Sequence, residues 1–235
     1  MSKKEELRAQ RVNTIINGVS KYQEKDVNIA LEAVKSYIKE EFNVILKHDK
    51  TIRLMDIISK LKLLYNDVHF TETFESSNMR PDGGILYLAS LSDSYFPVLI
   101  TEVKNQGTND LRLKEGKSIQ AMGNAIERLG KNVIGFRTFL LNEGIFPFVC
   151  FGYGYDFNPS SSINDRVKTI AMFGELNEVN VVNFGKTGQF NRGSFFFRQS
   201  KWEIQEMVEI MIDIVEKSIY YYFAKYGKDF FIKNN

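Results

Sequence analysis

Cysteine is nearly absent: Cys150 is the only one among 235 residues. A single thiol cannot form an intrachain disulfide, and such a chain is typical of a reducing compartment. Cys150 lies in the apolar run 146–151, which favours a buried, unreactive thiol over a nucleophile. The two histidines, His48 and His69, are far apart and have no companions at metal-ligand spacing, so we do not expect a zinc site.

Long apolar runs and an excess of charge are also missing. No segment approaches the ~20 apolar residues of a membrane span, and no N-terminal stretch resembles a signal peptide, so we expect a cytoplasmic protein. The net charge of +2 does not by itself indicate a nucleic-acid binder. Residues 166–201 have more basic than acidic side chains. This excess suits either a phosphate-facing surface or a solvated basic face. This segment has two acidic residues, Glu175 and Glu178, and six basic ones, Arg166, Lys168, Lys186, Arg192, Arg198 and Lys201.

The remaining composition, 43% hydrophobic and 26% charged, is that of an ordinary globular protein. A chain of 235 residues can bury a substantial core, and we expect one domain over residues 1–235. Its N-terminal part, 1–66, reads as helical. Residues 67–152 hold a hairpin, a loop and a helix, and residues 153–235 hold further strands and a C-terminal helix. This order predicts an α/β fold in which helices flank a central mixed β-sheet.

Within the helical part, turn signals occur near Lys25-Asp26 and His48-Asp49. Between them Ile29, Ala33 and Tyr37 recur at intervals of four, and neighbouring Val34 and Ile38 widen this apolar stripe. We expect this stripe to face the core. An acidic residue of the same helix, Glu40 or Glu41, is a candidate for the active site, although a solvated charge is the simpler interpretation.

The segment Arg80–Lys104 predicts a β-hairpin with an acidic end. Residues 85–89 and 97–103 read as strands, and the polar run 90–94 reads as the turn between them. Folding there brings Asp82 opposite Glu102, and the alternation of side chains along a strand places Lys104 on the same face as Glu102. Two close carboxylates suit a hard cation such as Mg²⁺, and a neighbouring ammonium can stabilise charge on a phosphate. Taken alone, the pattern is also compatible with a turn aspartate and an ordinary exposed ion pair.

Downstream, apolar residues spaced by three and four predict an amphipathic helix over 122–140. Residues 146–151 predict a buried strand near the centre of the sheet. A surface loop is expected at 153–165, and further strands at 179–184 and 195–198. The helix that follows Trp202 has an acidic face, which would repel phosphates, so it should pack behind the sheet.

Three motifs occur in one order: Arg-Pro-Asp-Gly-Gly-Ile at 80–85, Glu-Val-Lys-Asn-Gln-Gly at 102–107 and Gly-Asn-Ala-Ile-Glu-Arg at 123–128. Together they resemble the EcoRI-like type II restriction endonucleases, a branch of the PD-(D/E)xK nucleases. The resemblance runs from about Asn78 to Phe151 and returns more weakly at 202–214. It implies a restriction-endonuclease-like fold and a Mg²⁺-dependent homodimer that cuts double-stranded DNA. It also implies a cognate DNA methyltransferase that protects the host.

The resemblance also assigns site residues. Asp82, Glu102 and Lys104 would be catalytic, and Asp82, Glu102 and the backbone carbonyl of Val103 would bind the metal. The residues that would read an AATT core and its flanks are Gln120, Ala121, Met122, Gly123, Asn124, Ala125, Glu127 and Arg128. Asn can pair with adenine in the major groove, and Arg with groove acceptors. The same Asn124 and Glu127 also fit a helix capping box, which does not exclude base contact.

The segment 118–122 differs from that of the best-known members, so GAATTC is one hexamer that fits and the outer base pair stays open. The predicted function is a type II restriction endonuclease that cuts a palindrome containing AATT and leaves a 5′-phosphate. The alternatives are another PD-(D/E)xK nuclease, of the repair or junction-resolving kind, and a non-cleaving DNA-binding protein with this fold.

Overall fold

The computed structural model describes residues 15–105, 116, 123–157, 161–171 and 175–232. The helices are α2 (Ile15–Phe42), α3 (Leu54–Leu64), α5 (Gly123–Phe139), α6 (Ser162–Ala171), α7 (Gly185–Gly188) and α8 (Ile204–Tyr226), with short 3-10 turns at Tyr155–Phe157 and Lys228–Phe230. The strands are β1 (Leu46–Asp49), β2 (Ile52–Arg53), β3 (Asn78–Met79), β4 (Gly84–Ala89), β5 (Tyr95–Asn105), β6 (Phe148–Tyr153) and β7 (Ser194–Arg198).

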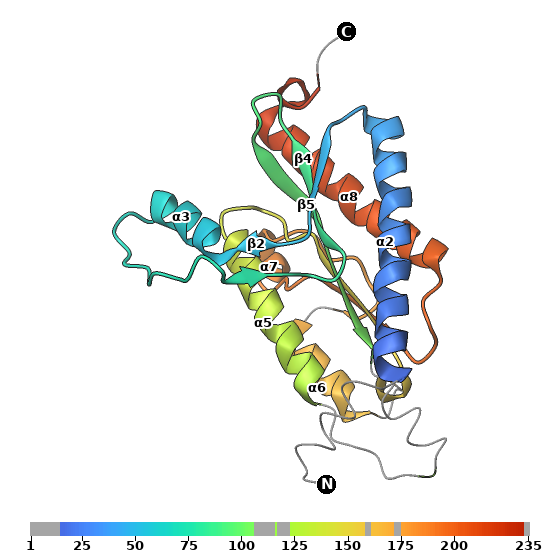
Figure 1. Ribbon diagram of the computed structural model, residues 1–235. Helices are drawn as coiled ribbons and strands as arrows, with labels where there is room; N and C mark the ends of the chain where they lie inside the picture. Colours follow the sequence, from blue (N-terminus) through green and yellow to red (C-terminus); the bar gives the residue numbers. More distant parts are fainter. Residues whose placement is uncertain (1–14, 106–115, 117–122, 158–160, 172–174, 233–235) are drawn as a thin grey trace.

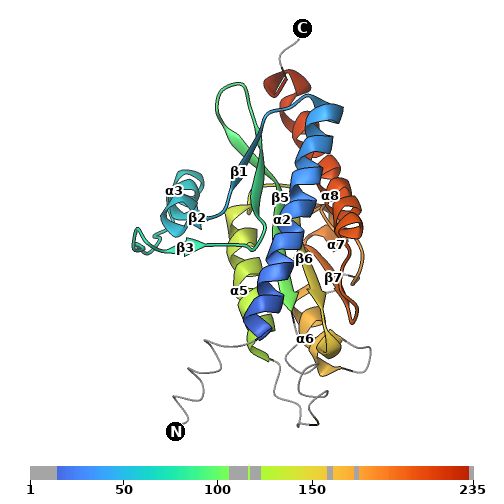
Figure 2. The same cartoon turned by 45° about the vertical axis from the view of Figure 1, so that its right-hand side comes forward.

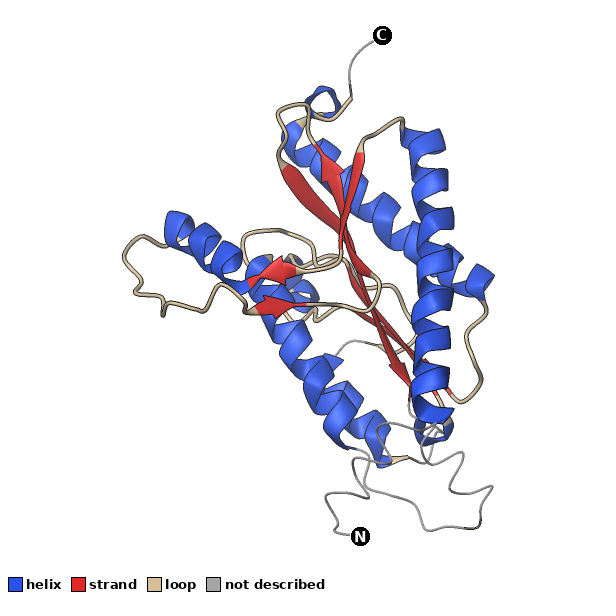
Figure 3. Cartoon of the chain, viewed as in Figure 1, coloured by secondary structure: helices blue, strands red, loops and turns tan. Residues whose placement is uncertain are grey.

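Five strands form one mixed sheet in the order β1-β4-β5-β6-β7. Figure 3 shows strands in red and helices in blue. The first three strands pair antiparallel, whereas β5, β6 and β7 pair parallel. Parallel neighbours need a crossover connection, and α5 lies in the one between β5 and β6. The predicted mixed sheet with flanking helices is therefore confirmed.

Helices cover both faces of this sheet, and the alternation of side chains along each strand decides which residue faces which helix (Figures 1 and 2). Helices α2 and α8 pack on one face, where Val103 and Phe151 join their apolar cluster. Helices α3, α5 and α6 contribute to the other cluster, which includes Ile100 and Cys150. Glu102 and Lys104, which alternate with Val103 in β5, consequently point to the α5 face.

Helix α2 differs from the prediction in two ways. It continues through the expected turn at Lys25-Asp26, and of the expected buried stripe only Val34 and Ile38 face the core. Ile29 is 44% exposed and Tyr37 36% exposed. Spacing alone allowed both stripes, but α2 packs against α8 and β5 through Val27, Ala30, Leu31, Val34, Ile38 and Phe42.

Three other elements depart from the sequence prediction. Residues 46–49, expected at a turn between helices, form strand β1 along the edge of β4. The loop expected at 153–165 contains a 3-10 turn and the start of α6. Residues 179–184 are not a strand: Val182 makes an isolated bridge to Ile145, and the next few residues turn into α7.

The hairpin, the helix before β6 and the strand β7 agree with the prediction. The apolar stripe of α5, Ile126, Leu129, Val133 and Phe136, and Leu140 just after it are fully buried or nearly so. Cys150 is buried in β6, as expected for an unreactive thiol. Within the described part of the chain, no helix is both long enough and apolar enough to span a membrane.

Candidate active site and recognition helix

A tight turn at residues 81–84 places Asp82 beside strand β5. The Gly84 N–H donates to the Pro81 carbonyl at 3.0 Å, and the Gly83 N–H donates to the Thr101 carbonyl at 2.9 Å. A Cβ on Gly83 would lie 2.8 Å from the Thr101 Cβ and 2.9 Å from the Val27 Cγ1, so only glycine lets the turn approach this closely. Gly84 has a φ of +80°, which an L side chain rarely adopts. The two glycines of the motif therefore bring Asp82 to the sheet.

His48 supports this turn from the edge strand β1. Its imidazole Nε2–H donates to the Gly83 carbonyl at 2.8 Å. Burial lowers the pKa of His48, which favours the neutral ring as the donor. No partner for His48 could be predicted from the sequence, because Gly83 is 35 positions away and becomes adjacent only when β1 pairs with β4.

Asp82 and Glu102 are linked to each other through the backbone. The Val103 N–H donates to Asp82 Oδ2 at 3.0 Å, and the Asp82 N–H donates to Glu102 Oε2 at 3.3 Å. The Glu102 side chain is only 3% exposed, whereas that of Asp82 is 27% exposed. The hairpin thus holds two carboxylates side by side, one buried and one open to solvent.

The Lys104 ammonium lies at the centre of this group. It pairs with Glu102 Oε1, lies 3.6 Å from Asp82 Oδ2 and donates to the Val103 carbonyl at 3.2 Å. The structure therefore brings together all the side chains predicted to be catalytic, and all three groups predicted to bind a metal surround one positive charge.

The charges of the group depend on one another. Burial raises the pKa of Glu102, and the neighbouring Asp82 carboxylate raises it further, while Lys104 opposes both effects. Burial alone would lower the pKa of Lys104, but the negative charge of Glu102 and Asp82 outweighs it and raises that pKa. Each buried charge is thus tolerable because its partner is present.

Asn132, which the sequence did not single out, also contacts the group. Its side-chain Nδ2 on α5 donates to Glu102 Oε1 at 3.1 Å. Asparagine at the middle of an amphipathic helix carries no sequence signal of its own. Only the packing of α5 on the face of Glu102 identifies it.

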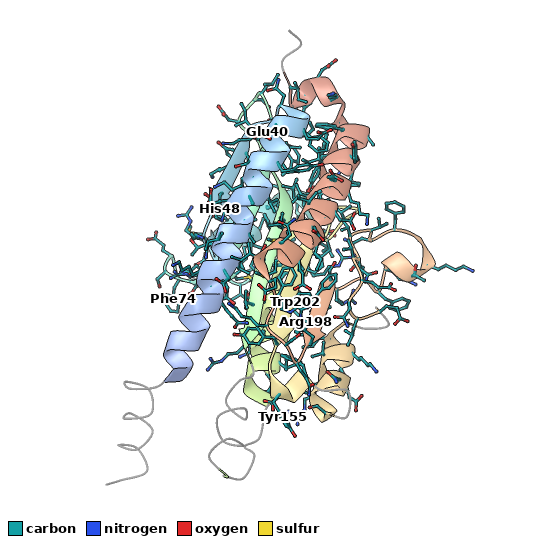
Figure 4. The ribbon with its side chains drawn as sticks, turned by 90° about the vertical axis from the view of Figure 1, so that its right-hand side faces the viewer. Glu40, His48, Phe74, Tyr155, Arg198 and Trp202 are labelled. Carbon is teal, nitrogen blue, oxygen red and sulfur yellow. The ribbon has the colours of Figure 1, made fainter. Side chains whose placement is uncertain are left out.

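The oxygen donors fit a hard divalent cation. Carboxylate and carbonyl oxygens are the ligands that Mg²⁺ prefers, and they already converge on a cation, the Lys104 ammonium. Among the described residues no cluster of three or more His, Cys, Asp or Glu residues suits a metal, so the two carboxylates are the side chains available here. Glu40 does not join them: it follows Val27, which abuts the turn, by 13 residues, or about 20 Å of helix. Figure 4 places it at the far end of α2.

The predicted recognition residues lie at the start of α5. The backbone of Gly123, Asn124 and Ala125 forms the first turn of this helix, and Glu127 and Arg128 are exposed on it. The side chains of residues 123–125 and all of residues 120–122 lie outside the described part of the chain. Both interpretations of Asn124, helix cap and base contact, stay predictions.

The three arginines of the basic segment 166–201, which are candidates for DNA contact without an assigned role, have different surroundings. Arg166, on α6, lines a hollow of about 230 Å³ together with Glu127 and Gly130 of α5. Arg192 donates to backbone carbonyls of its own loop.

Arg198 is partly exposed, but its guanidinium is held by contacts within the protein. Its guanidinium donates to both carboxylate oxygens of Glu206 and lies 3.8 Å from the centre of the Trp202 ring (Figure 4). The hydrogen bond from Arg198 lowers the pKa of Glu206 to about 2. Arg198 is therefore a structural residue rather than a free phosphate ligand.

Comparison with known proteins agrees with this geometry. The sequence profile described as "Restriction endonuclease EcoRI" matches residues 9–164, which include the hairpin and the first turns of α5. The type II restriction enzyme RsrI of Cereibacter sphaeroides is 28% identical over 178 residues, which span 62% of this chain and 64% of that relative. The type II restriction enzyme EcoRI of Escherichia coli is 24% identical over an alignment of 247 positions, covering 90% of this chain and 89% of that relative. The chain therefore belongs to the EcoRI family of type II restriction endonucleases, which are site-specific deoxyribonucleases.

Proposed function

We propose that the protein is a Mg²⁺-dependent endonuclease that cuts both strands of a short palindrome containing AATT. The observation that carries this proposal is the convergence of Asp82, Glu102 and the Val103 carbonyl on Lys104 at the end of the hairpin. An EcoRI-family chain with this arrangement has the groups that phosphodiester hydrolysis needs. The family profile spans both the hairpin and the recognition helix, and the alignment with EcoRI of Escherichia coli covers 90% of the chain, which together support one nuclease domain.

In this reaction the oxygen of a water molecule attacks the phosphorus in line with the 3′ oxygen. The P–O3′ bond breaks, the proton of the water passes to the leaving oxygen through solvent, and the products are a 5′-phosphate and a 3′-hydroxyl. Lys104 would orient the water and stabilise charge on the phosphate in the transition state. Asp82, Glu102 and the Val103 carbonyl would hold Mg²⁺, which when bound supplies positive charge next to the scissile phosphate.

The AATT preference rests on the similarity at 123–128. Asn124 and Ala125 would meet the adenines, and Glu127 would orient Arg128 or accept from a base amine. Glu127 and Arg128 are exposed at the start of α5, which leaves them free to reach a groove. Gln120, Ala121 and Met122 would read what flanks the core, so GAATTC is one candidate among the hexamers that contain AATT.

Each chain has one Asp82–Glu102–Lys104 group, whereas a double-strand cut needs two. A two-fold dimer on a palindrome supplies the second group by symmetry. Sedimentation at micromolar concentration should therefore give a dimer with the DNA duplex, and a monomer with and without DNA would contradict the dimer. A host that carries such an enzyme in its cytoplasm would need a methyltransferase that modifies the same site.

The direct test is digestion of a sequenced genome with Mg²⁺, followed by sequencing of the fragment ends. We expect discrete fragments whose joined ends restore one palindrome containing AATT. Discrete ends without AATT would overturn the recognition assignment. Random ends, or no cleavage at any Mg²⁺ concentration, would overturn the proposed activity itself.

A further inference from the structure

Glu102 is a buried carboxylate whose two oxygens are held by different donors. Oε2 accepts from the Asp82 N–H at 3.3 Å, and Oε1 accepts from both Lys104 and the Asn132 amide, the latter at 3.1 Å. Its side chain is 3% exposed, so water can supply little of the solvation that a buried charge requires.

The Lys104 ammonium cannot fully neutralise Glu102 and contact the attacking water and phosphate at the same time. In the proposed reaction its ammonium turns to the attacking water and the phosphate, so it no longer neutralises Glu102 in full. The Asn132 amide has no charge to offer a phosphate, and its helix is anchored by buried Leu129, Val133 and Phe136 on either side. Asn132 can therefore keep Glu102 oriented while Lys104 moves.

We propose that Asn132 is a positioning residue for the reaction: it fixes the Glu102 carboxylate in the orientation that binds the metal. This inference rests on the proposed function, because it assumes that Glu102 is a metal ligand. Groups that orient a metal ligand through a hydrogen bond commonly change metal affinity or activity by about 10–100-fold when they are removed.

Each substitution of Asn132 has an effect that can be predicted from these contacts. Asn132→Ala removes the donor and leaves Oε1 with Lys104 alone. Asn132→Asp keeps the shape but adds a third carboxylate to the group, next to Glu102 Oε1, so repulsion adds to the effect of the lost hydrogen bond. Asn132→Gln keeps an amide donor on a longer side chain, so it should recover part of the function. Ile134→Ala is the matched control, since Ile134 lies on the same helix and is 69% exposed.

The experiment measures three quantities on each variant with one AATT duplex. These are the duplex affinity without divalent metal, the single-turnover cleavage rate against Mg²⁺ concentration, and Mn²⁺ binding to the protein–DNA complex by calorimetry. For Asn132→Ala we expect unchanged duplex affinity, a cleavage rate about 10–100-fold lower, and a Mg²⁺ midpoint and a Mn²⁺ dissociation constant raised about tenfold. Asn132→Asp should be worse, Asn132→Gln intermediate and Ile134→Ala normal.

Three outcomes would overturn the inference. The first is that Asn132→Ala and Asn132→Asp both cleave DNA and bind Mn²⁺ like the wild type. Another is an equal loss of affinity for AATT and scrambled duplexes with normal metal binding, which would make Asn132 a DNA-backbone contact. The third is found by also measuring the thermal midpoint of each variant: a lowered midpoint in both Asn132→Ala and Asn132→Gln, with no change in metal dependence, would make the role structural. A wild-type protein that cuts no DNA would instead overturn the proposed function, while its Mn²⁺ binding could still be compared with that of Asn132→Ala.

Discussion

The end of the β4–β5 hairpin and the start of α5 are built in opposite ways. At the hairpin, Asp82, Glu102 and Lys104 are held by one another, by backbone groups and by Asn132. At α5, Glu127 and Arg128 extend into solvent. Chemistry benefits from groups fixed in advance, because no energy is then spent on arranging them during the reaction. Side chains proposed to read bases instead need donors and acceptors that are not already used within the protein. The two regions should therefore fail differently when they are mutated.

Glu102→Gln should have the largest effect. It keeps the shape of the side chain but removes the charge that faces the metal and Lys104, and we expect a loss of about 10²–10³ or more in the Mg²⁺-dependent cleavage rate. Affinity for the AATT duplex without metal should largely survive. Glu209→Gln on the exposed face of α8 is the control, and a Glu102→Gln enzyme as fast as this control would remove Glu102 from the active site.

Asn124→Ala and Arg128→Ala should have the next largest effect, on binding rather than on chemistry. A well-made bidentate base contact is worth roughly 1–3 kcal/mol, so affinity for AATT should fall by about tenfold to more than a hundredfold. Affinity for a scrambled duplex rests on phosphates and should fall much less. Competition binding in Ca²⁺ measures both, with Lys217→Ala as a charge-matched control on α8. An equal loss for both duplexes would make Arg128 a phosphate or structural contact.

Substitution of Gln120 should have a smaller effect that is confined to the flanking base pair. One altered pair typically changes affinity by about 1–3 kcal/mol, so the preference at the outer position should change while the AATT requirement persists. The measurement is competition binding across duplexes that differ at one position at a time. Loss of the AATT requirement would place Gln120 in the core recognition group instead.

Arg198→Ala should have the smallest effect, on stability alone. It removes the stacking on Trp202 and the ion pair with Glu206, together on the order of 1 kcal/mol at this partly exposed site. The pKa of Glu206 is lowered to about 2 in the folded protein, whereas an ordinary Glu carboxyl has a pKa of about 4.3. The ion pair therefore adds to the free energy of unfolding above about pH 4.3, and this contribution should disappear as the pH falls from about 4.3 towards 2. Urea unfolding of the wild type and of Arg198→Ala between pH 2 and pH 7 measures this contribution. Loss of DNA affinity in Arg198→Ala without loss of stability would contradict the structural role of Arg198.

The sequence predicted the elements whose signal is local. Strict alternation placed Glu102 and Lys104 together and Val103 opposite, and the three-four spacing defined the buried stripe of α5. Sequence-based prediction failed for elements whose buried face or strand pairing depends on another element of the fold. Two stripes on α2 have helical spacing, and only the packing of α8 and β5 selects the one with Val27. Strand β1 is too short and too polar to be recognised before β4 lies beside it.

The same limit applied to the site. Both carboxylates and the lysine belong to one hairpin, so the sequence could bring them together. His48 and Asn132 reach the site from β1 and α5, and no spacing rule connects either residue to a partner about 30 positions away. Such supporting contacts become visible only in three dimensions.

If cutting and reading are carried out by different residues of this chain, one pair of measurements on Lys104→Ala should separate them. The first is the single-turnover cleavage rate of an AATT duplex in Mg²⁺, and the second is the affinity for AATT and scrambled duplexes in Ca²⁺. We expect cleavage to fall by about 10²–10³ or more while the preference for AATT remains. Cleavage within about tenfold of the wild type would exclude Lys104 from the chemistry, and a loss of the AATT preference in this variant would show that cutting and reading are not separate.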